Sequence, residues 1–133
     1  MDMDKKIEEF LKGQVFAVVG ASRDRSKYGN KVLRAYRQNN RKVYPVNPQA
    51  KEVEDMLAYA DLSSLPEPIH GISIVTPPDV TERVVDHAAQ LGIKHIWMQP
   101  GAESEQAIAR GQFHDLNVIA GGPCALVVLG YHE

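Results

Sequence analysis

Short runs of consecutive apolar residues recur along the chain between polar segments. The clearest is the β-branched run at residues 15–19, which stops at Gly20. A strand that is apolar at every position must be covered on both faces, so this run predicts a buried strand of a parallel sheet. Similar runs predict strands at residues 42–46, 72–75, 95–98 and 118–120. Asn47 and Pro48 end the second strand, because proline lacks the amide donor that a sheet interior needs.

Segments with helical spacing of apolar residues separate these strands. The spacing occurs at residues 7–11, 32–36, 80–88 and 107–113 and predicts four helices. Asp79 and Glu82 resemble a capping box at the start of the third helix, and Gly92 closes it. Residues 51–68 follow no single pattern. For them we expect a short helix, an edge strand near residues 56–59 and a turn near residues 63–66.

This alternation of strands and helices defines the expected fold. Parallel βαβ units with right-handed crossovers follow from it. The sequence therefore predicts an α/β protein with a Rossmann-like, doubly wound, mostly parallel five- to six-stranded sheet and helices on both faces. The chain has 133 residues, and we expect residues 1–133 to form one domain.

Charge and cysteine content narrow the class of partner. The 15 basic and 17 acidic side chains give a net charge of −2, which provides no overall attraction for nucleic acid or for an anionic membrane. No apolar run approaches the roughly 20 residues that span a bilayer, and the first residues lack the apolar centre of a secretion signal. Cys124 is the only cysteine, so we expect no intrachain disulfide and a cytoplasmic location.

Two loops are the expected ligand site. Doubly wound sheets bind ligands beyond the carboxyl ends of the strands, where successive connections leave in opposite directions. This rule points to the loop after Gly20 and to the loop at Thr76, Pro77 and Pro78. The first spans ten residues from Gly20 to Gly29, whereas βα loops usually have about 2 to 6. Long ordered loops are commonly functional, but a plain polar connection with solvated basic residues stays open as an alternative.

The first loop carries the residue types that suit a diphosphate. Gly20 and Gly29 let the backbone approach an anion closely. Ser22 and Ser26 can donate hydroxyl hydrogen bonds, and Lys27 supplies positive charge. The free amides at the start of the next helix also attract phosphate. The dinucleotide fingerprint GxGxxG is absent, and no acidic residue ends the second strand to hold a ribose. An NAD(P)-binding oxidoreductase or redox sensor is therefore kept only as the alternative function.

Five segments stand out as a set. They are FAVVGAS at residues 16–22, KYGNKV at 27–32, VYPVNP at 43–48, VTPP at 75–78 and IWMQPGA at 96–102, followed by Cys124. Together they resemble the CoA-binding domain family, which includes the N-terminal domain of the succinyl-CoA synthetase alpha subunit and small, YccU-like CoA-binding proteins. The resemblance implies that coenzyme A or an acyl-CoA binds at the C-terminal ends of the strands. The synthetase reaction is not implied, because its phosphorylated histidine lies in a later domain.

The resemblance also assigns residues to parts of the ligand. The phosphates would be faced by Gly20, Ala21, Ser22, Ser26, Lys27, Tyr28 and Gly29. The adenosine end would be flanked by Val46, Asn47 and Pro48, with Lys51 near a phosphate of the nucleotide. The diphosphate and pantetheine would be bordered by Val75, Thr76, Pro77, Pro78 and Val80, and the far side closed by Gln99 and Gly101. The sequence departs from the family pattern at VEDMLAYADL, residues 53–62.

No catalytic or metal-binding constellation is evident in the sequence. The histidines, His70, His87, His95, His114 and His132, lack metal-ligand spacing, and a single cysteine cannot complete a structural zinc site. Cys124 has no neighbouring base or cation in the sequence, which favours a buried, unreactive thiol, and a reactive or mixed-disulfide role stays open as the alternative. The expected activity is thus binding alone. A homodimer formed through an exposed edge strand, or a partner chain that supplies ligase or transferase chemistry, stays open.

Overall fold

The computed structural model describes residues 2–133. Its helices are α1 (Met3–Leu11), α2 (Tyr28–Gln38), α3 (Pro78–Gln90), α4 (Glu105–Phe113) and α5 (Ala125–Val128), with a single 3-10 turn, η1, at Leu62–Ser64 among these residues. Its strands are β1 (Val15–Val19), β2 (Lys42–Val46), β3 (Glu52–Val53), β4 (Met56–Leu57), β5 (Gly71–Ile74), β6 (His95–Met98) and β7 (Asn117–Ile119). Strands and helices alternate along most of the chain, as the apolar pattern predicts.

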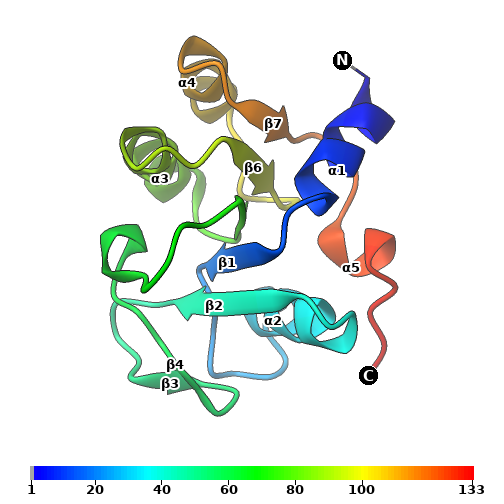
Figure 1. The fold of residues 1–133 in the computed structure, drawn as a ribbon, viewed down its shortest axis with the longest axis vertical. Coiled ribbons are helices and arrows are strands. Elements are labelled where there is room, and N and C mark those ends of the chain that lie inside the picture. The colour runs from blue at the N-terminus through cyan, green and yellow to red at the C-terminus, as the bar shows by residue number, and fades with distance from the viewer. Residues whose placement is uncertain (1) are drawn as a thin grey trace.

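Five strands form one parallel sheet in the order β2-β1-β5-β6-β7. After β2, at one edge of the sheet, the chain returns across β1 to form β5 on its other side (Figure 1). The connections on the two sides of β1 therefore leave in opposite directions. This confirms the doubly wound α/β prediction and places the switch point between β1 and β5.

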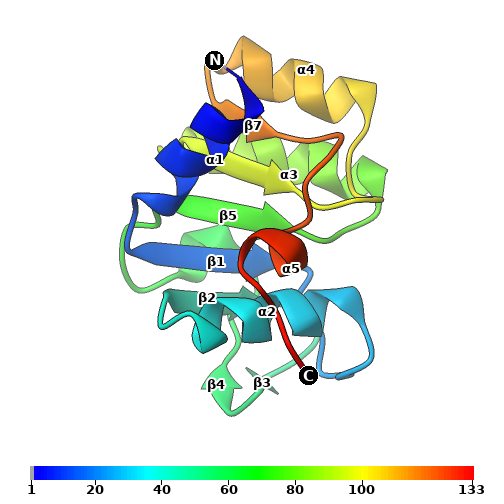
Figure 2. The same ribbon diagram turned by 90° about the vertical axis from the view of Figure 1, so that its right-hand side faces the viewer.

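Helices cover both faces of the sheet. Helices α1, α2 and α5 pack on one face and α3 and α4 on the other (Figure 2). Strand β1 supplies both cores, because Phe16 and Val18 join the first cluster while Ala17 and Val19 join the second. All four side chains are buried, which explains why the strand is apolar at every position.

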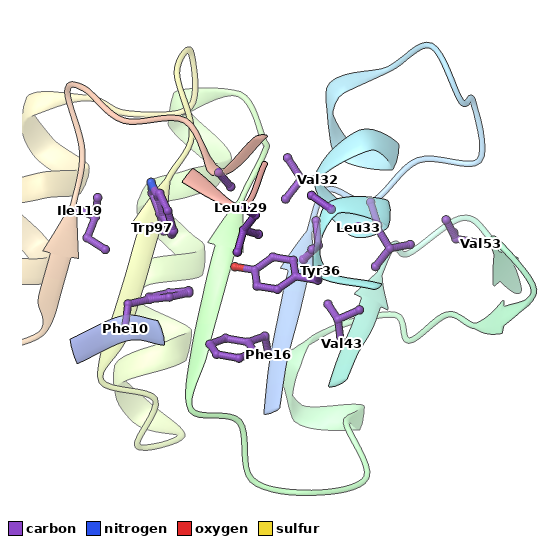
Figure 3. Packing of buried hydrophobic residues seen from close by; sticks show 14 residues of the cluster. Phe10, Phe16, Val32, Leu33, Tyr36, Val43, Val53, Trp97, Ile119 and Leu129 are labelled. Carbon is purple, nitrogen blue, oxygen red and sulfur yellow. The ribbon is translucent and has the colours of Figure 1, made fainter. Parts of the chain in front are cut away.

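Aromatic side chains fill the core on the first face (Figure 3). The ring of Phe10 from α1 lies 5.3 Å from that of Phe16 and 5.3 Å from that of Trp97, centroid to centroid. Tyr36 from α2 is fully buried, and its hydroxyl forms a hydrogen bond of 2.6 Å with the buried hydroxyl of Ser73. These contacts fix α1 and α2 on the strands that carry the site.

The strand predictions are largely confirmed. Strands β1, β2 and β6 have the predicted bounds, and β5 and β7 each begin one residue earlier than predicted. Pro45 lies within β2, where its missing amide is tolerated because β2 is an edge strand of the main sheet. Within residues 2–133, no helix combines the length and apolar character needed to cross a bilayer.

Two local predictions need correction, and one short helix was not predicted. The capping box at Asp79 is wrong: α3 begins at Pro78, and Asp79 lies in its first turn, because proline already has the φ angle of a first helical residue. A strand lies near residues 56–59 as predicted, but β4 pairs only with β3 in a separate hairpin, and Tyr59 alone, beyond β4, bridges to Val46 of β2. Helix α5 was not predicted at all.

Candidate functional site

The loops after β1 and β5 lie against each other at the switch point. The amide of Val75 donates to the carbonyl of Val19 at 2.8 Å and so continues the strand pairing to the mouth of the crevice. Gly20 has a φ of +94°, and a Cβ there would lie 2.1 Å from the carbonyl oxygen of Val75. Only glycine fits this position, on both backbone angle and space.

The start of α2 faces the same point. A Cβ on Gly29 would lie 2.1 Å from the carbonyl oxygen of Gly20, so the helix approaches β1 as closely as its backbone allows. Lys27 is the N-cap residue, and no side chain of the described chain caps the helix there. The first amides of α2 thus keep their hydrogen-bonding capacity and the positive end of the helix dipole for an anion.

Internal hydrogen bonds order the loop between β1 and α2. One carboxylate oxygen of Asp24 accepts from the Ser26 amide at 2.9 Å and from the Ser26 hydroxyl at 2.7 Å. The Ser22 hydroxyl accepts from the Asp24 amide at 3.1 Å. The hydrogen bonds from Ser26 hold the pKa of Asp24 below its usual value. The Ser26 hydroxyl therefore already donates to Asp24, whereas the Ser22 hydroxyl only accepts and keeps its proton for a bound anion.

The side chain of Asn30 holds this loop in place from the first turn of α2, and no pattern in the sequence indicated this role. Its side chain is fully buried, and its amide donates to the carbonyl of Ser22 at 2.8 Å and to Glu54 Oε2 at 3.1 Å. Arg34 completes the support, donating from Nε to Asn30 Oδ1 at 2.7 Å and from Nη2 to the Arg25 carbonyl at 2.8 Å. The asparagine lies one residue beyond Gly29, but its buried partners depend on the tertiary fold.

An apolar cavity of about 290 Å³ opens beside the loop, on the face that α3 covers. It is lined by Val19, Gly20, Val46, Pro48, Ala60, Asp61, Leu62, Thr76, Val80, Val84 and His87. The ends of β1, β2 and β5 thus contribute to it together with the first three turns of α3. A cavity this small and apolar suits one ring system of a ligand and not a whole nucleotide.

Several residues assigned by resemblance surround this cavity. Val46, Pro48, Thr76 and Val80 line it. Asn47 does not: its amide donates to the Ala21 carbonyl at 2.8 Å, and its Oδ1 accepts from the Gln49 amide at 2.7 Å. The side chain of Asn47 thus connects the loop after β2 to the loop after β1.

Other assigned residues lie at the periphery of the crevice. Pro77 and Pro78 are exposed at the start of α3, and Lys51 is exposed at the base of the β3–β4 hairpin. Gly101 is exposed after β6, has a φ of +95° and donates its amide to Glu103 Oε1 at 3.2 Å. The crevice is therefore built mainly by the β1, β2 and β5 loops.

A polar cluster lies beyond β6. Gln99 is fully buried, and its Oε1 accepts from the Ala125 amide at 2.8 Å and from the Tyr28 hydroxyl at 3.4 Å. Because a backbone amide can only donate, this bond fixes the orientation of the Gln99 amide and leaves Nε2 without a partner among residues 2–133. The Tyr28 hydroxyl also contacts the thiol of Cys124. Burial and the contact with Cys124 raise the pKa of Tyr28, so the phenol stays protonated.

The histidines do not converge on this site, except for His87 in the cavity wall. His70 and His95 stack with ring centroids 4.2 Å apart, at the start of β5 and β6 and so at the opposite edge of the sheet. Burial and the neighbouring His70 lower the pKa of His95. Asn117 donates to His95 Nδ1 at 3.0 Å and to the carbonyl of Lys6 in α1 at 2.9 Å. We interpret this pair as part of the contact between α1 and the sheet.

Comparison with known proteins agrees with this architecture. The model of the CoA binding domain family matches residues 14–130. The chain therefore belongs to the CoA-binding domain family, as its sequence segments suggested. The family match spans every strand of the sheet and both loops of the crevice.

The chain is also similar in sequence to individual proteins. It is 34% identical over 80 residues to acetate–CoA ligase [ADP-forming] II of Archaeoglobus fulgidus, covering 59% of this chain and 12% of the ligase. It is 29% identical over 91 residues to the alpha subunit of acetate–CoA ligase [ADP-forming] II of Pyrococcus furiosus, covering 68% of this chain and 20% of the subunit. The chain thus spans a fifth or less of the length of these two ligases. A solved structure of a conserved hypothetical protein from Pyrococcus furiosus has a TM-score of 0.82 and 34% identity, covering 87% of this chain and 99% of that one.

Proposed function

We propose that the chain binds coenzyme A or an acyl-CoA in the crevice at the carboxyl ends of β1, β2 and β5. The observation that carries this proposal is the close approach of Gly29 to the carbonyl of Gly20, which brings the uncapped start of α2 to the switch point. Backbone amides there offer a diphosphate its hydrogen bonds without a large side chain between them. Membership of the CoA-binding domain family supports the same ligand.

The assigned residues give the ligand a direction along the crevice. Gly20, Ala21, Ser22, Ser26, Lys27, Tyr28 and Gly29 serve the phosphates, and Val46, Pro48 and Lys51 the adenosine end. The diphosphate and pantetheine run past Val75, Thr76, Pro77, Pro78 and Val80 toward Gln99 and Gly101. Gln99 is fully buried, so of the two residues assigned to that far end only the exposed Gly101 presents its surface to the pantetheine.

The alternative, an NAD(P)-binding enzyme, gains no support. In dinucleotide folds an acidic residue after the second strand holds a ribose. Here Asn47 takes that place, and both ends of its side-chain amide are bonded to the backbone. The loop also lacks a second glycine between Gly20 and Gly29.

We propose that the chain performs no catalytic step alone. Two relatives are named as ADP-forming acetate–CoA ligases, and this chain corresponds to a small part of each. Ligase chemistry would accordingly need a partner chain, and this chain would contribute the CoA site. Co-purification of the chain with an ATP-dependent partner would support that role.

Thermal unfolding with CoA, acetyl-CoA, NAD and NADP tests the proposed ligand. A ligand at 100 times its dissociation constant stabilises the fold by roughly 2.7 kcal/mol, so CoA should raise Tm clearly and the nicotinamide nucleotides should not. Lys27→Ala should weaken CoA binding without changing Tm of the free protein, since Lys27 is exposed. Lys5→Ala on α1 is the matched control. A shift with NAD and none with CoA would overturn the proposal.

A further inference from the structure

The apolar cavity extends from the adenosine side of the proposed ligand to Gly20, Thr76 and Val80 on the side assigned to its phosphates. Two of its lining residues, Val46 and Pro48, come from the end of β2, and in doubly wound folds this strand end contacts the ribose next to the base. The pantetheine arm carries amides, which an apolar pocket would leave without partners. A flat purine base, with its large apolar faces, is the part of the ligand that this cavity fits.

Few hydrogen-bonding side chains face the cavity. The hydroxyl of Thr76 is bonded to the hydroxyl of Thr81 at 2.8 Å. His87 lines the far end on α3. The donor and acceptor roles of the two imidazole nitrogens can exchange, so the position of His87 alone does not favour one purine over another. Asp61 is different, because a carboxylate only accepts hydrogen bonds.

The local structure holds the Asp61 side chain in a defined orientation. Its Oδ1 accepts from the Ser63 hydroxyl at 2.5 Å, and from the Ser64 amide and hydroxyl, each at 3.1 Å. These bonds cap the η1 turn and leave Oδ2 without a hydrogen bond in the described part of the chain. The hydroxyl of Ser63, with that of Ser64, keeps the pKa of Asp61 below its usual value.

We propose that Asp61 selects adenine by accepting a hydrogen bond from the exocyclic amino group of the base. This inference rests on the proposed function, because it assumes that a nucleotide occupies the crevice. A purine with an oxo group at the same position places an acceptor against the carboxylate. Two facing acceptors repel each other, so such a nucleotide binds more weakly.

Calorimetric titration with ADP and IDP tests the selection, because these nucleotides differ only in the base. Wild-type protein should bind ADP about tenfold more tightly, the effect of one hydrogen bond to a charged group. Asp61→Asn should reverse the preference. The cap needs an acceptor for the Ser64 amide, so the new oxygen stays on the cap and the new amide group faces the base as a donor.

Controls separate this inference from the proposed function. Asp4→Asn on α1 makes the same change of charge at an exposed position and should keep the wild-type preference. An unchanged Tm of Asp61→Asn would show that the cap is kept. Equal affinity of the wild type for ADP and IDP, or an unchanged ratio in Asp61→Asn, overturns the role of Asp61. Failure of CoA and ADP to bind the wild type at all overturns the proposed function instead.

Discussion

At the scale of single residues, Gly29 is the most constrained position of the site. Its φ is not in the left-handed region, so alanine would suit the helical backbone, and space alone excludes a side chain. The atom in the way is the carbonyl oxygen of Gly20, part of a backbone that cannot rotate aside. A Cβ must therefore push α2 away from the end of β1.

Gly29→Ala should lower both stability and ligand affinity. Overpacking of this kind costs about 1–3 kcal/mol, measurable as a lower midpoint in urea unfolding. CoA affinity should fall as well, because the amides of α2 move away from the phosphates. Gly122→Ala is the control: nothing lies within 4 Å of a Cβ there, and its stability should stay within about 0.5 kcal/mol of the wild type. Wild-type stability in Gly29→Ala would contradict the close approach.

At the scale of secondary-structure elements, the β3–β4 hairpin reaches the ligand loop through its turn. Glu54 lies in that turn, and its carboxylate accepts from Asn30 at 3.1 Å and pairs with Arg25 at 3.4 Å. Its backbone carbonyl accepts from Arg37 on α2 at 2.9 Å. Arg25 is largely exposed, so the ion pair adds little, whereas the bond to buried Asn30 matters more.

Glu54→Ala should weaken CoA binding about fivefold, because losing a hydrogen bond to a buried amide costs about 1 kcal/mol. Glu54→Gln keeps an acceptor for Asn30 and should bind CoA nearly as well as the wild type. Hydrogen exchange of the amides in residues 22–27 should accelerate in the alanine variant only. Glu52→Ala, an exposed change in the same hairpin, serves as control. Equal affinities in all variants would refute this support of the loop.

The secondary-structure elements also show which parts of the fold can be predicted from patterns in the sequence. Strands β1 and β6 were predictable because nearly continuous burial leaves an apolar run with clear ends. Strand β2 begins with the exposed Lys42 and was predictable because Asn47 and Pro48 mark its end. The hairpin was not, since its turn has positive φ at Glu54 and Asp55 without the glycine or asparagine that usually marks such a turn. Helix α5 has four residues, too few for a helical period to be visible.

In the candidate site, too, only part of the arrangement could be predicted from the sequence. Gly20, Gly29 and the loop at Thr76 were predictable, because topology alone brings strand ends together. Asn30, Glu54 and the cavity wall around Asp61 were not, because their roles depend on contacts between segments far apart in sequence. The region that departs from the family pattern, residues 53–62, contains two of these three residues.

At the scale of the whole molecule, the two cores share one sheet. Neighbouring residues of β1 point into opposite clusters, so loss of one cluster exposes the strand to solvent and weakens the other. Both ends of the chain also contact the rest of the molecule. Near the N-terminus, α1 packs beside β7. Near the C-terminus, the side-chain amide of Gln38 forms two hydrogen bonds with the backbone of His132. No part of the sheet can separate without breaking both layers.

We therefore expect residues 1–133 to unfold in a single transition. Trp97, the only tryptophan, is buried in the first cluster, so its fluorescence reports on that face. Circular dichroism reports on all helices, and hydrogen exchange of α3 and α4 reports on the second face. The three probes should give one urea midpoint, and CoA should shift all three by the same amount, because the crevice contacts both faces. Earlier exchange of α3 and α4 would indicate two separable units and contradict a single cooperative domain.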